Sequence, residues 1–441
     1  MTTWQVRIAR VFGIADHEAR PVMTGALLFF MLFAGYFMLR PVRETMGVAG
    51  GVDNLQWLFT GTFLATLAAM PLFGWIAAKV PRRTILPWTF GFFALNLALF
   101  AVCFHLQPDN LWIARTFYIW LSVFNLIAIS VVWSVCVDLF PMAQAKRVFA
   151  LMAAGASLGG LVGPLLGIAL VGVIGHAGLL WLASILLVAG IAVARHLQRW
   201  RDAQPVREEL TADARRRPLG GSPFAGFTTV LRSPFLLGIS LFVLLLASVS
   251  TFLYFEQARL VELTFPDRAD QTRVFGTIDV VVQSLTILSQ LFITGRLVQR
   301  LGLGVLLVAV PAVAMLGFVW LALAPTFAVL AVVMVVRRAG EYAFVRPGRE
   351  MLFTVVPTEA KYKAKNFIDS VVYRGADAVS GWAKALVDIL AQQPAIAALI
   401  GAAIALAWGL TGAGLARAQA RIADRESLPD GLDVAGEGLR R

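Results

Sequence analysis

A run of charged residues interrupts a stretch of this chain that is otherwise apolar enough for two membrane-spanning helices. Between Val333 and Leu390 it comprises Arg337, Arg338, Glu341, Arg346, Arg349, Glu350, Asp369, Arg374, Asp377, Lys384 and Asp388. A charge near the centre of a bilayer costs from about 2.5 kcal/mol upward, so such residues usually face a protein interior or a watery pathway. The run therefore predicts a pathway for a polar solute.

A second set of charges follows the first apolar segment. Tyr36, Arg40 and Arg43 are spaced i, i+4 and i+7, so they share one helix face, although Pro41 loosens the turn between them. Basic residues outnumber acidic ones in these segments, and the planar fork of arginine matches carboxylate and phosphate oxygens. We therefore expect an anionic substrate. Its expected contacts, with the last two in support, are Tyr36, Arg40, Arg43, Arg337, Arg338, Arg374 and Lys384.

Two faces are expected on the later helices, since residues advance by about 100° each along a helix. Arg338, Glu341 and Arg349 fall within about 80° of one another on that basis. A polar stripe of similar width is formed by Arg374, Asp377, Lys384 and Asp388. Each stripe should face protein or water rather than lipid.

The acidic residues of these segments have two interpretations. A carboxylate in a medium of low dielectric constant can exchange a proton in the working pH range. It can equally pair with a basic neighbour, as the i, i+4 spacings of Arg337 with Glu341 and of Lys384 with Asp388 suggest. Proton coupling and internal ion pairing both stay open for Glu44, Glu256, Asp279, Glu341, Asp377 and Asp388.

The composition is that of a polytopic membrane protein. Of the 441 residues, 59% are hydrophobic and 15% charged, against roughly 25% charged in soluble domains. The net charge of +12 is not gathered into a basic domain, which argues against a nucleic acid polymer as partner. Two cysteines within apolar segments and four scattered histidines predict no disulfide framework, metal centre or cofactor. The expected partners are the lipid bilayer and a small-molecule anion, and we expect a monomer.

Twelve segments reach the roughly 20 mainly apolar residues that a spanning helix needs. They are Met23–Leu39, Leu55–Ala78, Ile85–His105, Leu111–Leu139, Val148–Ile174, Ala177–Ala194, Phe235–Phe255, Val274–Ile293, Gly304–Ala324, Thr326–Phe344, Phe367–Leu390 and Ala395–Ala416. Arg40-Pro41 is expected to end the first. The predicted fold is an all-α integral membrane protein with two parallel six-helix repeats.

The predicted organisation follows from one polar linker between the sixth and seventh segments. It gives an N-terminal segment (1–20), two six-helix bundles (21–198 and 233–416), a central loop (199–232) and a C-terminal tail (417–441). The halves repeat weakly, because Gly74–Arg83 closes the second segment as Gly295–Gly304 closes the eighth. Parallel repeats place a binding site between them near the bilayer midplane.

Lysine and arginine predict the orientation, because cytoplasmic connections carry an excess of both. With both termini inside, the inner connections are basic, and the outer ones around Pro108, His176, Pro325 and Pro394 contain neither residue. Only the outer turn after the seventh segment departs from this, with Arg259, Arg268 and Arg273 balanced by acids. We expect a multi-pass protein of the cytoplasmic (inner) membrane with cytoplasmic termini.

A glycine motif in the fifth segment links the chain to a known superfamily. Glycines at four-residue spacing let helices approach closely, so packing alone can explain it. The motif, formed by Gly155, Gly159, Gly163, Pro164 and Gly167, also resembles the fifth-helix motif of antiporters of the major facilitator superfamily. Gly74–Arg83 resembles that superfamily's loop between helices two and three, with Ala78 in place of the usual aspartate and Pro81 of the usual glycine.

A narrower resemblance rests on four stretches: Tyr36–Glu44; Gly220–Gly226 with Ser233–Leu236; Pro347–Glu350 followed by Lys361–Asp369; and Val372–Asp377. These look like the nucleotide exchange transporters, the ATP/ADP translocase family of plastids and intracellular bacteria, and their bacterial relatives. The chain is somewhat shorter than a typical member and has arginine where some translocases carry lysine in the first helix. The resemblance implies an exchange transporter and leaves its substrate open.

We therefore expect a secondary active transporter that exchanges a polar organic anion, such as a nucleotide or another phosphorylated metabolite, by alternating access. Glu341 and Asp377 would pair with the arginines when the site is empty. No G-x-x-x-x-G-K-[ST] phosphate loop occurs, which argues against ATP-driven pumping. The alternatives are a transport-dead receptor or assembly platform and a proton-coupled transporter of another small solute. An enzyme ranks last, because the sequence shows no His-Asp or Ser-His set.

Overall fold

The computed structural model describes residues 16–139, 142–202, 226–391 and 393–427, and every regular element within them is a helix. The first half contains α2 (Asp16–Ala49), a 3-10 turn (Val52–Asn54), α3 (Leu55–Lys79), α4 (Arg82–Leu106), α5 (Leu111–Leu139) and α6 (Met142–Asp202). At about 1.5 Å per residue, α6 would measure roughly three times the thickness of a bilayer core. Gly175 divides it into two helices, since its φ of 65° lies in the left-handed region that glycine tolerates.

The second half begins with the short α8 (Phe227–Arg232) and continues with longer helices. These are α9 (Pro234–Thr264), α10 (Arg268–Ser289), α11 (Gly295–Leu323), α12 (Phe327–Gly340), α13 (Arg346–Leu352), α14 (Thr358–Phe367), α15 (Tyr373–Ala391) and α16 (Pro394–Ser427). π-helical turns at Gln290–Thr294, Glu341–Val345 and Ile368–Val372 join α10 to α11, α12 to α13 and α14 to α15. A 3-10 turn (Phe353–Val355) follows α13, and Gly302 divides α11.

The twelve predicted spans each coincide with a helix, which confirms the all-α membrane fold. Among the described residues, nine helical stretches are long and apolar enough to cross a membrane. One of them, Leu151–Trp200, contains two spans because it divides at Gly175. The two remaining predicted spans contain more charge. Thr326–Phe344 falls on α12 and the π-helical turn after it, and Phe367–Leu390 falls on α15 and the π-helical turn before it.

The predicted end of the first span at Arg40-Pro41 is wrong, because α2 continues to Ala49. Proline removes only one backbone hydrogen bond from a helix. Leaving the helix inside a membrane would expose many more backbone groups to lipid. The hydroxyl of Thr45 donates to the Pro41 carbonyl at 3.1 Å, one turn farther along the uninterrupted helix.

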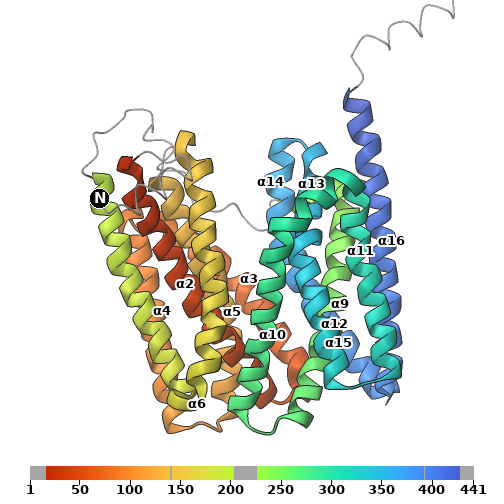
Figure 1. Ribbon diagram of the computed structural model, residues 1–441, viewed down its shortest axis with the longest axis horizontal. Coiled ribbons are helices and arrows are strands. Elements are labelled where there is room, and N and C mark those ends of the chain that lie inside the picture. The colour runs from red at the N-terminus through yellow and green to blue at the C-terminus, as the bar shows by residue number, and fades with distance from the viewer. Residues whose placement is uncertain (1–15, 140–141, 203–225, 392, 428–441) are drawn as a thin grey trace, which may run out of the picture.

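Two helical bundles stand side by side, and each has its own apolar core (Figure 1). One core takes its residues from Val22 to Leu197 and the other from Val230 to Leu415. A third apolar cluster draws on both halves, with Val48 and Leu58 from the first and Phe255 and Phe275 from the second. Each half is therefore a packing unit, and the third cluster joins them.

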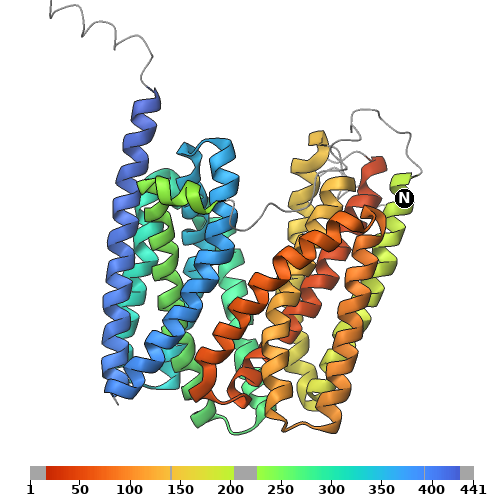
Figure 2. The same cartoon turned by 180° about the vertical axis from the view of Figure 1, so that it is seen from behind.

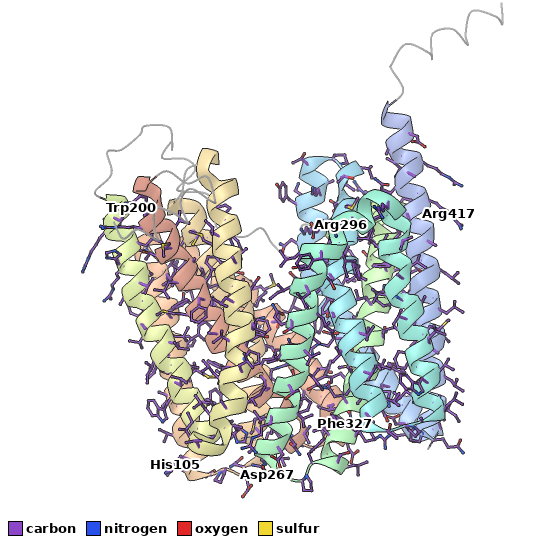
Figure 3. The ribbon with its side chains drawn as sticks, in the orientation of Figure 1. His105, Trp200, Asp267, Arg296, Phe327 and Arg417 are labelled. Atoms are coloured by element: carbon purple, nitrogen blue, oxygen red, sulfur yellow. The ribbon has the colours of Figure 1, made fainter. Side chains whose placement is uncertain are left out.

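The halves meet at one side of the molecule and separate toward the other (Figure 2). We call the side at which α2 begins and α16 ends the terminal side, and the other the opposite side. Figure 3 shows Trp200, Arg296 and Arg417 on the terminal side and His105, Asp267 and Phe327 on the opposite side. Between the halves, α10 packs against α2 and α6, and α15 packs against α3.

Candidate functional site

The charged side chains of α2, α10 and α12 lie at a similar depth. At about 1.5 Å per residue, Arg40 is about 14 Å from the end of α2 at Ala49, and Arg337 about 15 Å from the start of α12 at Phe327. Asp279 is about 17 Å from the start of α10 at Arg268. All three helix ends are on the opposite side, so the three residues lie about halfway through a hydrocarbon core of roughly 30 Å.

Asp279 is shared by two arginines from different halves. Its Oδ1 lies 2.6 Å from Arg338 Nη2 on α12 and 3.6 Å from Arg40 Nη1 on α2. The Asp279 side chain is 5% exposed and that of Arg40 is 20% exposed. The stronger contact stays within the second half, and the weaker one spans the two halves. Of the two arginines on Asp279, Arg40 is consequently the one that another anion could more readily engage.

Glu341 is also shared by two arginines, both from the second half. Arg337 Nη1 lies 3.0 Å from Glu341 Oε2 and donates to Ser250 Oγ on α9 at 2.8 Å. Arg346 Nη2 lies 3.5 Å from Glu341 Oε1. The Arg346 guanidinium stacks 4.3 Å over the ring of Tyr342. The Arg346 side chain is 55% exposed, whereas that of Arg337 is 5% exposed.

These contacts leave an excess of positive charge at mid-depth. Four arginines share two carboxylates, so two guanidinium charges have no carboxylate of their own within the two groups. Burying unbalanced like charges is costly, because attraction to a counter-ion must offset the desolvation of each ion. The two more exposed guanidiniums, those of Arg40 and Arg346, are the ones that can reach a counter-ion from solution.

Two further ion pairs beside these groups are internally balanced. Arg43 Nη1 lies 2.9 Å from Glu44 Oε1, and the guanidinium stacks 3.9 Å over the Tyr118 ring of α5. On α15, Arg374 lies 3.5 Å from Asp377, which also accepts a hydrogen bond from Thr251 at 3.4 Å. Each pair is close to neutral, so these residues line the surroundings of the site and do not change its net positive charge.

Several predicted site residues lie elsewhere. Lys384 Nζ lies 2.6 Å from Asp388, and Glu256 pairs with Arg259, so these residues are paired outside the two groups around Asp279 and Glu341. Arg349, predicted to share a face with Arg338 and Glu341, instead pairs with Asp369 at 3.0 Å. The π-helical turn Glu341–Val345 is the reason, because its wider turn rotates everything that follows.

The same turn explains why the sequence did not single out Arg346, although it stands in the charged run. Arg346 follows Glu341 by five residues, a spacing that an α-helix does not bring together and a π-helical turn does. Ser250 and Tyr342 were also missed. Ser250 carries no signal at the sequence level, whereas an aromatic ring between Glu341 and Arg346 could have been noted.

On the opposite side, one buried hydroxyl connects three helices from both halves. The hydroxyl oxygen of Thr272 on α10 lies 2.7 Å from the hydroxyl oxygen of Thr45 on α2. It also lies 2.9 Å from Nε2 of His176 in α6. Arg268 adds an ion pair of 3.1 Å with Asp109 in the connection between α4 and α5. We call Thr45, His176 and Thr272 the threonine junction. The threonine junction joins the halves on the opposite side, closer to that side than Arg40 and Asp279.

The glycine motif of α6 lies against the backbone of α2. A Cβ atom on Gly155, Gly159 or Gly163 would approach the carbonyl oxygens of Ala26, Phe30 and Ala34 to 2.6 Å or less. Gly167 is looser, with 3.3 Å to the oxygen of Met38. The motif therefore sets a close approach of two helices within the first half, which is the packing interpretation.

Comparisons with known proteins identify the architecture. Residues 22–360 match the sequence-family model described as Major Facilitator Superfamily. No curated protein matches the chain in sequence. The solved structures that resemble it include a POT family transporter in complex with 5-aminolevulinic acid, with a TM-score of 0.62 and 13% identity over 90% of this chain and 96% of that one.

Two further structures share the fold. The nucleoside transporter NupG has a TM-score of 0.62 and 13% identity, covering 90% of this chain and 98% of that one. A bacterial homolog of the human lysosomal transporter Spinster, in an inward-facing and unoccupied conformation, has a TM-score of 0.58 and 16% identity, covering 94% and 99%. At these identities the likeness concerns the fold alone.

Proposed function

The chain belongs to the major facilitator superfamily of secondary transporters, and we propose that its substrate is an organic anion with two negative charges or two anionic groups. The observation that carries this proposal is the sharing of Asp279 and Glu341 among four arginines. A dianion supplies the two charges that the empty site lacks. Arginine forks bind carboxylate and phosphate oxygens in two-point contacts, so dicarboxylates and phosphate esters are the candidate classes.

In this proposal the arginines divide into two kinds. Arg40 and Arg346 contact the substrate, since they are the more exposed arginines of the two groups, at 20% and 55%, while the partner carboxylates are buried. Arg337 and Arg338 hold Glu341 and Asp279 in place, each at 3.0 Å or less. Tyr36, Arg43 and Arg374 line the surroundings, and Lys384 plays no direct part. The sequence predicted direct contact by Arg40, Arg43, Arg337 and Arg338. This assignment keeps it for Arg40 and adds Arg346 in place of the other three.

Exchange follows from the same arrangement. A bound dianion compensates Arg40 and Arg346 and weakens the contact between Arg40 and Asp279 across the halves. Without it, that contact re-forms and disfavours the movement of the empty carrier. A carrier that moves readily only when loaded exchanges one anion for another. We therefore infer antiport, in keeping with the resemblance to nucleotide exchangers, and name nucleotides and other phosphorylated metabolites as the first candidates.

The orientation remains the one that the lysine and arginine distribution predicts. With the termini in the cytoplasm, the joined opposite side faces away from the cytoplasm and the halves separate toward it (Figure 1). Such an arrangement is inward-facing. The inner membrane is the location we propose.

The test is counterflow into proteoliposomes preloaded with candidate dianions: nucleotides, sugar phosphates and dicarboxylates. We expect exchange with one of these classes, and loss of it in Arg40→Ala and Arg346→Ala. Arg273→Ala is the matched control, because Arg273 pairs with Asp270 at the surface and both side chains are about half exposed. Exchange of monoanions at equal rates, or unaltered exchange in both variants, contradicts the proposal.

Two alternatives predict other outcomes. A receptor or assembly platform without transport predicts that the variants impair partner binding while no anion exchanges at all. A proton-coupled transporter predicts uptake driven by a pH gradient without a counter-substrate. In that case neutralising Asp279 or Glu341 abolishes uptake more completely than removing Arg346.

A further inference from the structure

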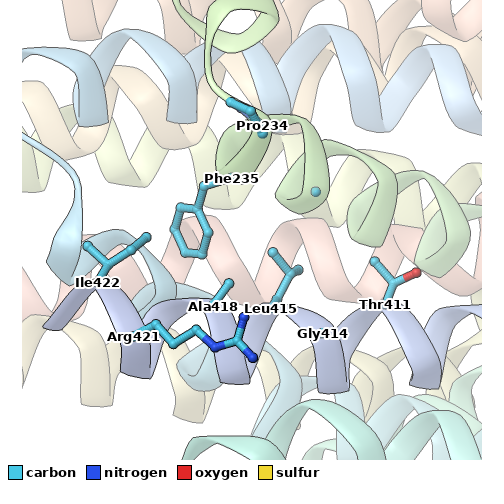
Figure 4. A pocket seen from close by; sticks show the side chains of 9 residues that line it. Pro234, Phe235, Thr411, Gly414, Leu415, Ala418, Arg421 and Ile422 are labelled. Atoms are coloured by element: carbon cyan, nitrogen blue, oxygen red, sulfur yellow. The ribbon is translucent and has the colours of Figure 1, made fainter. Parts of the chain in front are cut away.

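A groove lies between the terminal-side ends of α9 and α16, away from the charged groups (Figure 4). Its volume is about 560 Å³, and Phe235, Leu415 and Ile422 contribute its apolar walls. Gly238 and Gly414 face it without side chains, and nothing lies within 4 Å of where a Cβ on Gly414 would stand. The hollow therefore results from small residues on two helices whose neighbours are bulky.

One cation stands in this apolar groove. Arg421 lines it, and Figure 4 shows the side chain extending along α16 toward Ala418 and Leu415. Among the residues that the structure describes, no carboxylate lies within ion-pairing distance of Arg421. A guanidinium beside an apolar surface with no acidic partner is suited to an external anion.

The depth of the groove matches the edge of a membrane. The predicted span of α16 ends at Ala416, and Arg421 lies about 7 Å farther along the helix at about 1.5 Å per residue. Thr411, at the far end of the groove, lies within the predicted span, about 17 Å from Ile422 on the same scale. The groove thus runs from headgroup level into the hydrocarbon and has its positive charge at the headgroup end.

We propose that this groove binds a phospholipid with an anionic headgroup, one acyl chain lying between α9 and α16 and the headgroup phosphate on Arg421. Charge complementarity and depth together select this occupant. The site faces the leaflet on the terminal side, where anionic lipids attract basic residues when that side is cytoplasmic. It is independent of the anion exchange proposed above.

The experiment is native mass spectrometry of the purified protein with phosphatidylglycerol and phosphatidylcholine of identical acyl chains. Wild type should retain phosphatidylglycerol more tightly. Arg421→Ala should weaken its binding about fivefold, the effect of roughly 1 kcal/mol for one basic residue at a membrane surface, and leave phosphatidylcholine unchanged. Arg417→Ala is the control, since Arg417 is exposed on the same helix and does not line the groove.

Filling the groove gives a second, independent test. Gly414→Phe should reduce binding of both lipids, whereas Gly414→Ala should leave it intact, and thermal unfolding of the two variants shows that they fold. Equal losses in Arg421→Ala and Arg417→Ala would mean diffuse surface charge and would overturn the proposal. The proposal would also be overturned if glycerol phosphate raised the thermal unfolding midpoint as much as phosphatidylglycerol does. A dimer that Gly414→Phe dissociates would overturn it as well.

Discussion

Arg40 and Asp279 form an ion pair across the two halves of the protein, with Nη1 and Oδ1 3.6 Å apart. The same carboxylate oxygen lies 2.6 Å from Arg338, which belongs to the same half as Asp279. The cross-half contact is the longer of the two and has the more exposed arginine. It can therefore break without leaving Asp279 unpaired. A contact of this kind suits a carrier whose halves must move relative to each other.

Asp279→Asn should destabilise the protein. Removing one partner of a buried ion pair costs about 3–5 kcal/mol, because the remaining charge stays buried without compensation. Arg338, 10% exposed, would be that charge. The measurement is the thermal unfolding midpoint in detergent. Asp270→Asn should change it little, since the Asp270–Arg273 pair is at the surface and such pairs contribute about 0–1 kcal/mol.

The double variant Asp279→Asn with Arg338→Gln sharpens this prediction. It removes the uncompensated charge, so part of the lost stability should return. Exchange should stay impaired, because Arg40 no longer has a partner when the site is empty. A double variant no more stable than Asp279→Asn would show that Asp279 acts through some other contact.

Arg346→Ala and Arg337→Ala should differ in kind. Arg346 is largely exposed, so its loss should raise the KM for the exchanged anion about 10- to 150-fold, which corresponds to roughly 1.5–3 kcal/mol for a hydrogen bond to a charged group. The thermal unfolding midpoint of Arg346→Ala should stay near that of wild type. Arg337→Ala should lower the midpoint, because Glu341 and Ser250 lose a buried partner. Equal effects on both quantities in the two variants would contradict the division of roles.

Most of the spans could be predicted from the sequence, because a run of about 20 apolar residues marks each of the helical stretches that are long and apolar enough to cross a membrane. Ion pairs within one helix could also be predicted, because i, i+4 spacing is a local property. Arg337 and Glu341 have this spacing, and Nη1 of the one lies 3.0 Å from Oε2 of the other. The fold class followed from these features. The helix end at Pro41 did not, since membrane burial outweighs the local effect of proline.

The candidate site itself depends on contacts that no local pattern contains. Asp279 meets Arg40 only because α10 packs against α2, and nothing in either segment specifies that approach. The place of Arg346 beside Glu341 depends on a π-helical turn, which has no sequence signature comparable to the α-helical period. The sequence thus predicted which charged residues lie in the membrane, but it did not predict their partners in other helices.

Gly159→Ala and Gly91→Ala should have opposite effects on stability. A Cβ on Gly159 would come within 2.6 Å of the Phe30 carbonyl oxygen, so α6 must move away from α2, an overpacking that typically costs about 1–3 kcal/mol. A Cβ on Gly91 of α4 meets nothing within 4 Å, and alanine there should stabilise the helix by about 0.5–1 kcal/mol. Thermal unfolding of both variants checks this. Tolerance of Gly159→Ala would mean that the helices pack less tightly than the distances indicate.

The threonine junction should weaken in acid through His176, which lies in the connection between the fifth and sixth spans. Burial, aided by the positive charge of Arg268 and opposed by Asp267, lowers the pKa of His176 from 6.5 to about 4. The closed junction therefore favours the neutral ring. The contribution of the junction to the free energy of unfolding is complete above the ordinary pKa of an exposed histidine, about 6.5. It is lost as the pH falls from there toward 4.

The measurement is the unfolding midpoint between about pH 7.5 and pH 4.5. Wild type should lose stability over this range, and His176→Gln, which keeps a polar side chain beside Thr272 without a titrating ring, should lose less. His196→Gln is the matched control, since His196 is exposed at the terminal-side end of α6 and should leave the wild-type pH dependence intact. If His176→Gln retains the full acid sensitivity, the titrating groups lie outside the junction. A difference confined to His176→Gln would place the acid-sensitive contact at Thr272, where α2, α6 and α10 meet.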